Sequence, residues 1–143
     1  MAAQPQHLIL PTSLRHQIFE HARQNSSFEC CGLLIGSGTD FVVVQAVVQA
    51  ANVSRQPRDH FEIDPQVQFE AMRRLRGTTQ RIIGHYHSHP GGPTTPSAYD
   101  LSMAHDPEAV WLIITLNPTE ALAAFICPNQ KQGFKPLLIM NAE

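Results

Sequence analysis

The sequence has few charged side chains, no long hydrophobic run and no excess of positive charge. Charged residues make up 15% of the 143 positions, and the formal net charge is −2. A protein with this balance has no basic surface for nucleic acid or an anionic membrane. Its longest apolar stretches have the length of strands, well short of the roughly 18 residues of a membrane span. We therefore expect a soluble protein with neither nucleic acid nor membrane as a partner.

Cysteine is also scarce, and the start of the chain has no targeting pattern. Cys30 and Cys31 are adjacent and Cys127 lies far away, so three cysteines make no disulfide framework. Residues 1–7 lack the basic and long apolar segments of a secretory signal. Repeats and low-complexity segments are missing too, and the length suits one domain. We expect a single cytoplasmic domain over residues 1–143.

Helical and strand patterns alternate along the chain, which predicts an α/β domain. The second helix has the clearest boundaries, because Asp64 can cap it, Pro65 suits its first position and Gly77 follows its end. A short apolar segment at 8–10 precedes the first helix, and segment 61–63 is short and extended after a polar loop. Helices are expected at 13–24, 65–76 and 96–105, and strands at 29–35, 41–48, 81–87, 110–116, 121–126 and 134–140, of which the first two are suited to a hairpin.

Three histidines, His85, His87 and His89, alternate in the segment GHYHSHP. Strand residues two apart share a face and lie about 6.6–6.8 Å from each other. Two imidazoles at this spacing can converge on one metal ion with bonds of about 2.0–2.1 Å. The pattern by itself also fits a histidine-rich surface strand.

Ser97 and Asp100 follow these histidines on a predicted helix that Thr95 and Pro96 begin. At positions i and i+3 they share one helical face, so the Asp100 carboxylate can complete a set of two histidines and one aspartate. Three protein ligands leave the fourth tetrahedral position open, which is typical of a catalytic rather than a structural site. This downstream pair favours a metal centre over a surface strand.

A metal-activated water needs a base to take its proton, and the residue pattern alone does not choose one. Glu62 alternates with apolar neighbours and is expected to be exposed, and Glu70 occupies a solvated helix position. Glu29 begins an otherwise apolar strand, and a carboxylate that borders a core usually has a polar partner.

Taken together, these residues resemble the JAMM (MPN-plus) metalloproteases. The resemblance rests on ECCGLLIG at 29–36, HSHP at 87–90, Ser97 and Asp100. The stretch 52–65 is similar to the N-x4-P-x3-F-x-I-D-P pattern of bacterial members, whereas Ser27 replaces a proline that many members carry. The resemblance implies a mixed β-sheet flanked by helices in a cytidine-deaminase-like fold. Deaminase chemistry is not expected, because the chain has neither H-x-E nor C-x-x-C.

The resemblance also implies roles for individual residues. His87, His89 and Asp100 would bind one Zn²⁺ per chain, Glu29 would act as general base and then acid, and Ser97 would donate a hydrogen bond to the tetrahedral oxyanion. The implied activity is hydrolysis of the peptide or isopeptide bond after the C-terminal Gly-Gly tail of a small ubiquitin-like or sulfur-carrier protein. Only about ten residues separate Asp100 from the next strand, so the chain resembles compact bacterial members without the long insertion of eukaryotic ones.

Two other functions fit the same residues. One is a noncatalytic MPN-type scaffold that binds partner proteins, and the other is a zinc peptidase that acts on small or cell-wall peptides. His85 is expected to support a ligand or pack in the core, and the other five histidines (His7, His16, His21, His60 and His105) are expected at the surface. All three cysteines are expected to be buried packing residues, with a Cys–His nucleophile as a minor alternative.

Overall fold

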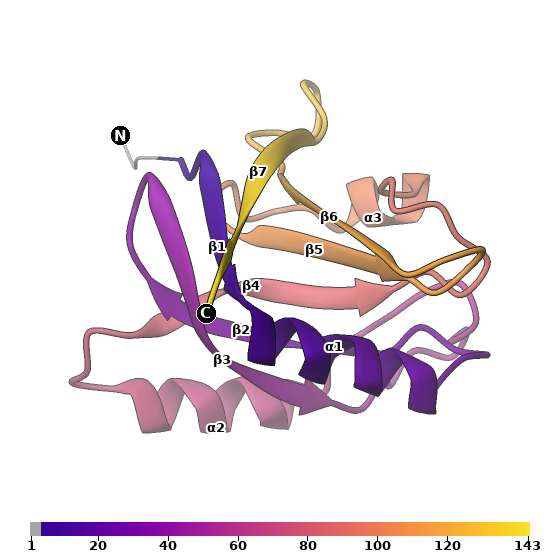
Figure 1. The fold of residues 1–143 in the computed structure, drawn as a ribbon, viewed down its shortest axis with the longest axis horizontal. Coiled ribbons are helices and arrows are strands. Elements are labelled where there is room, and N and C mark those ends of the chain that lie inside the picture. Colours follow the sequence, from indigo (N-terminus) through magenta and orange to yellow (C-terminus); the bar gives the residue numbers. More distant parts are fainter. Residues whose placement is uncertain (1–3) are drawn as a thin grey trace.

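The structure is a computed structural model that describes residues 4–143. Residues 1–3, at the start of the segment searched for a secretory signal, lie outside the described residues. Seven strands and three helices follow one another along the described part of the chain (Figure 1). They are β1 (His7–Pro11), α1 (Thr12–Gln24), β2 (Cys31–Ser37), β3 (Phe41–Ala50), α2 (Pro65–Leu75), β4 (Arg81–Ser88), α3 (Ala98–Ser102), β5 (Val110–Thr115), β6 (Ala121–Ile126) and β7 (Lys135–Ala142). None of these helices is long and apolar enough to cross a membrane.

The strands form one mixed sheet that closes into a barrel in the order β1-β3-β2-β4-β5-β6-β7. β1 runs parallel to β3 and β7, and β4 runs parallel to β5, whereas the other neighbours are antiparallel. The expected mixed α/β architecture and the β2–β3 antiparallel pair are therefore confirmed. The closure into a barrel was not predicted, and the cytidine-deaminase-like relationship and the single-domain organisation stay predictions.

β2 is buried on both faces, which explains its continuous apolar sequence. Leu34 belongs to the core that packs under α1, together with Ile18 and Tyr86. Leu33 and Ala71 lie in a second core on the other face, under α2. Because residues alternate between the faces of a strand, β2 anchors both helices at once and holds the residues that precede it in place.

Two predicted boundaries, those of the third helix and of the strand at Glu29, were wrong in ways that bear on the site. The predicted helix at 96–105 is the short α3, with Ser97 as its N-cap. The Gln130 side chain donates to the carbonyls of Leu101, Ser102 and Ala104, so these carbonyls need no further helical turn. Glu29 precedes β2 instead of beginning it, and segment 8–10 is part of the strand β1, whose partners β3 and β7 are distant in sequence.

Gly32 in β2 leaves the space that the ring of Tyr86 needs. A Cβ atom at residue 32 would lie 2.3 Å from Tyr86 Cε2, and Tyr86 is fully buried with its hydroxyl 2.7 Å from His21 Nδ1. We expect Gly32→Ala to lower the free energy of unfolding in urea by about 1–3 kcal/mol, because the overpacked ring cannot move away. Gly91→Ala, where no atom lies within 4 Å of the added Cβ, is the control, and equal destabilisation by both variants would contradict this account.

Candidate metal centre

The candidate site lies where β4 ends, at the end of the molecule that also carries α3 (Figure 1). His87 is in β4, His89 directly follows this strand, and Asp100 is in α3. The Nε2 atoms of His87 and His89 are 3.1 Å apart. Asp100 Oδ2 lies 3.4 Å from His87 Nε2 and 3.3 Å from His89 Nε2. The structure thus brings the three sequence-predicted ligands together at one point.

The separations between these three atoms fit a divalent metal ion. Bonds of about 2.0–2.1 Å in a tetrahedral arrangement place neighbouring ligand atoms about 3.3 Å apart, and the measured separations range from 3.1 to 3.4 Å. Two imidazole nitrogens with one carboxylate oxygen form a donor set suited to such an ion. The geometry therefore supports a metal-dependent site that these three side chains can hold together.

Burial and hydrogen bonding shift the pKa values of His87, His89 and Asp100 in different directions. Burial lowers the pKa of His87, which favours the neutral imidazole that a metal requires. Burial also opposes the charge on His89, but hydrogen bonds to Asp100 and to the Pro93 carbonyl outweigh it and raise the pKa of His89. For Asp100, burial is outweighed by the hydrogen bonds from His87 and His89, so its pKa lies well below the usual range. Asp100 is therefore an ionised carboxylate.

Ser97 and Asp100 hold each other in a capping box. The Asp100 N–H donates to Ser97 Oγ at 3.0 Å, and the Ser97 N–H donates to Asp100 Oδ2 at 2.9 Å. The ligand oxygen is thus fixed by the N-cap of its own helix. Because Ser97 Oγ accepts this bond, its O–H proton is free to donate elsewhere.

Glu29 reaches the same site from the segment before β2. One of its oxygens lies within 4.8 Å of ligand atoms of His87 and His89, and Oε1 is buried with no hydrogen-bond partner among the described residues. Burial raises the pKa of Glu29 to about 8, partly opposed by His89. A carboxyl with this pKa can both accept and donate a proton near neutral pH. By distance alone Glu29 could also be a metal ligand.

Asn52 is a positioning residue that the sequence analysis noted only as part of a family pattern. Its Nδ2 donates to the carbonyls of Glu29 and His60, at 2.8 and 2.9 Å. Its Oδ1 accepts from the N–H groups of Ser54 and Glu62, both at 3.0 Å. One amide therefore ties the loop that follows β3 to the backbone of Glu29. The family pattern over 52–65 included Asn52 but did not indicate this role.

The remaining candidates fall outside the cluster of ligand atoms. His85 packs edge-on against Trp111, with ring centroids 4.4 Å apart, and burial lowers its pKa to about 3. The three cysteines are buried, as predicted. The prediction of a surface position was wrong for His21, which is buried because α1 turns it toward the hydroxyl of Tyr86.

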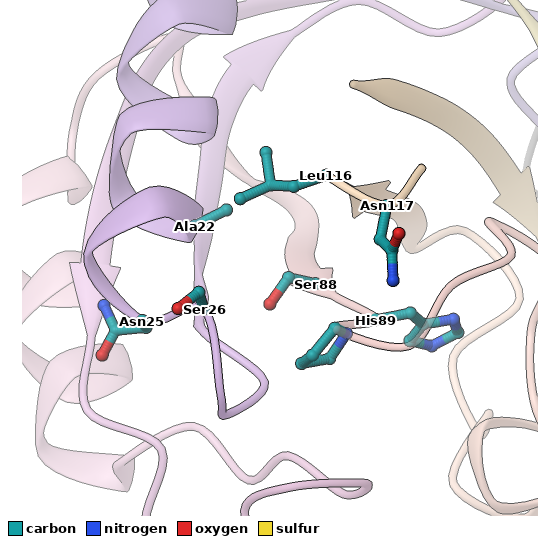
Figure 2. Close-up of a pocket in the computed structure, with 8 residues that line it drawn as sticks. Ala22, Asn25, Ser26, Ser88, His89, Leu116 and Asn117 are labelled. Carbon is teal, nitrogen blue, oxygen red and sulfur yellow. The ribbon is translucent and has the colours of Figure 1, made fainter. Parts of the chain in front are cut away.

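Two cavities flank the segment that holds Glu29 and Asn25. One of about 240 Å³ lies between the end of α1 and the ends of β4 and β5, and Figure 2 shows the His89 imidazole directed away from Ala22 and Asn25 in its wall. The other, of about 380 Å³, has Glu29 itself in its wall, together with Asn52 and Pro57. Glu29 therefore borders the second cavity and also lies close to His87 and His89.

Comparisons with known proteins include a family match that covers all of these site residues. The family described as prokaryotic homologs of the JAB domain matches residues 11–133. A desampylase from Haloferax volcanii is 34% identical over 110 residues, which cover 74% of this chain and 78% of the relative. A probable TtuB-protein conjugate cleaving protease from Thermus thermophilus is 27% identical over 126 residues, 87% of this chain and 79% of the relative. The solution structure of protein DSY2949 from Desulfitobacterium hafniense matches with a TM-score of 0.84 and 32% identity, over 95% of this chain and 93% of that one.

Proposed function

The chain belongs to the family of prokaryotic JAB-domain homologs, and from this premise we propose that it is a zinc-dependent isopeptidase of the JAMM type. Its substrate is the bond after the C-terminal Gly-Gly tail of a small ubiquitin-like or sulfur-carrier protein. The observation that carries the proposal is the convergence of His87, His89 and Asp100 beside the buried Glu29. Relatives named as a desampylase and as a conjugate-cleaving protease support the substrate class.

In this proposal His87, His89 and Asp100 hold the Zn²⁺ ion. When bound, Zn²⁺ supplies Lewis acidity, which lowers the pKa of water to roughly 7 and polarises a carbonyl oxygen. Glu29 accepts the proton of the attacking water and returns it to the leaving nitrogen. The new C–O bond forms first and gives a tetrahedral oxyanion, whose collapse breaks the C–N bond once Glu29 has protonated the leaving nitrogen. The products are a carboxylate on the carrier and an amine on its former partner.

In this proposal Ser97 stabilises the negative charge that develops on the carbonyl oxygen of the substrate. Its O–H proton is not used by the capping box, where Ser97 Oγ only accepts from Asp100 N–H. A hydrogen bond from this hydroxyl to the developing oxyanion is the kind of preorganised donor that lowers the barrier of acyl transfer. The same residue thus orients the ligand Asp100 and donates to the substrate.

The substrate tail is expected to lie along the loop between β3 and α2. Residues 52–63 form this loop, and its two ends meet in an isolated antiparallel bridge between Asn52 and Ile63. An extended Gly-Gly tail carries no side chains, so it can pass through a narrow groove and bind by its main chain. Asn52 in this loop also donates to the Glu29 carbonyl. The loop that would bind the substrate tail therefore also holds the general base in place.

We expect the zinc-loaded protein to remove residues placed beyond the Gly-Gly of such carriers. The test is incubation with a panel of small carrier proteins that bear a C-terminal extension, scored by intact mass. The expected product ends at Gly-Gly, and treatment with a metal chelator should stop its formation. A carrier whose Gly-Gly is replaced by Ala-Ala is the matched control. Uniform failure across the panel by a protein that carries stoichiometric zinc would remove this substrate class.

A further inference from the structure

The two histidine ligands differ in what holds their second ring nitrogen. His89 Nδ1 lies 2.9 Å from the carbonyl oxygen of Pro93, a hydrogen bond that fixes the orientation of the ring. His87 Nδ1 is buried and has no hydrogen-bond partner among residues 4–143. Histidines that ligate metals almost always use this nitrogen to bind a carbonyl, a carboxylate or water. Among residues 4–143, the contacts that can orient His87 are therefore those made by its ring.

Aromatic rings surround His87 where a hydrogen-bond partner would be expected. Phe61 stacks on the His87 imidazole with ring centroids 4.1 Å apart and planes 16° from parallel. Trp111 lies edge-on to the same imidazole, at 5.9 Å and 82°. His87 is completely buried, so these contacts leave its ring little freedom to rotate. The stacked partner, Phe61, is the one that defines the plane of the ring.

Phe61 is itself held in place by contacts that do not involve His87. The neighbouring His60 stacks on Tyr99 of α3, with centroids 3.8 Å apart and planes 16° from parallel. The His60 carbonyl also accepts a hydrogen bond from Asn52 Nδ2 at 2.9 Å. Trp111 lies edge-on to Phe61 at 6.1 Å. The loop that carries Phe61 is therefore fixed to α3 and to the segment of Glu29 independently of the ligand ring.

We propose that Phe61 is the positioning residue of His87, and that its stacked ring replaces the hydrogen bond that orients a metal-bound histidine. The inference rests on the metal centre proposed above. A stacked ring fixes the plane of an imidazole without polarising it, so His87 and His89 are supported by different physical means. Removing the ring should free His87 to leave the geometry that the metal needs, while the fold keeps its other contacts.

The test compares the metal affinity of Phe61 variants with that of a control. Phe61→Ala should weaken Zn²⁺ binding by about 10–100-fold, the usual cost of removing the support of a ligand. Phe61→Trp should retain most of the affinity, and Phe61→Leu, which fills space without an aromatic ring, should not. Phe134→Ala removes a ring that lies edge-on to Trp111 at 5.0 Å, and it should leave the affinity unchanged. Affinity is measured by competition with a chromogenic chelator.

Two further measurements distinguish a general loss of folding from a changed orientation of His87. The visible absorption of the Co²⁺-substituted protein should change in Phe61→Ala and not in Phe134→Ala, because only the first alters the ligand geometry. Urea unfolding of the metal-free variants shows whether each chain is folded. Wild-type affinity in Phe61→Ala, or full rescue by Phe61→Leu, would overturn the role of stacking. Wild-type protein that binds no metal would instead overturn the metal centre itself, and with it this inference.

Discussion

Glu29→Gln is expected to keep its metal and to lose kcat by about 10²–10⁴-fold, the usual contribution of a general acid and base. Glutamine has almost the same shape as glutamate but cannot accept the proton of water. Burial raises the pKa of Glu29 to about 8, so the wild-type carboxyl is suited to take up a proton and release it again within one turnover. Steady-state kinetics with an extended carrier, at full zinc occupancy, measure the loss.

Metal content decides between the two roles that the geometry permits for Glu29. Its ligand atom lies within 4.8 Å of those of His87 and His89, close enough for coordination. If Glu29 acts only on water, Glu29→Gln will hold one zinc ion per chain, as the wild type does. Glu70→Gln, on α2, is the matched control and should change neither activity nor zinc content. Loss of zinc in Glu29→Gln would reassign the residue as a ligand, and full activity would reassign the base.

The sequence predicted those parts of the fold that depend on local patterns. α2 was placed to within one residue because Asp64 caps it and Pro65 begins it. β1 was not recognised as a strand, since its five residues are stabilised by parallel pairing with β3 and β7, segments far away in the chain. The barrel closure depends on the same distant pairs. α3 was predicted too long because the hydrogen bonds that Gln130 donates to carbonyls at the end of this helix cannot be seen in a local pattern.

The candidate site likewise contains residues that local patterns predict and residues whose place depends on distant contacts. His87 and His89 could be predicted from their two-residue spacing at the end of a strand, and Asp100 from its spacing to Ser97. In the structure Ser97 is the N-cap of α3, so this spacing corresponds to a capping box instead of two positions within one helix. Glu29 could be chosen among three glutamates only through the family resemblance, because its approach to His87 depends on how the sheet folds. Phe61 gave no sign of its contact with His87, since stacking between a loop residue and a strand residue has no sequence period.

Asp100→Ala is expected to weaken zinc binding by more than the 10–100-fold typical of residues that only support a ligand, and to abolish turnover at micromolar zinc. The substitution removes the only carboxylate within hydrogen-bond distance of both histidine Nε2 atoms in the described part of the chain. It also removes half of the capping box with Ser97, which should cost about 1 kcal/mol of unfolding free energy in the metal-free protein. Competition titration and urea unfolding measure the two effects separately.

Asp100→Asn separates coordination from capping, because the amide oxygen can still accept the Ser97 N–H but is a poor zinc ligand. Its metal-free stability should be higher than that of Asp100→Ala because the Ser97 N–H keeps its acceptor, whereas its zinc affinity should fall nearly as far as that of Asp100→Ala. Asp106→Asn is the control, since Asp106 is exposed and accepts from the Glu108 N–H. If Asp100→Asn kept wild-type affinity, the carboxylate would serve only the helix cap. The metal would then have to be held by the two histidines with Glu29, and the separation of ligand and base that the proposed mechanism requires would be lost.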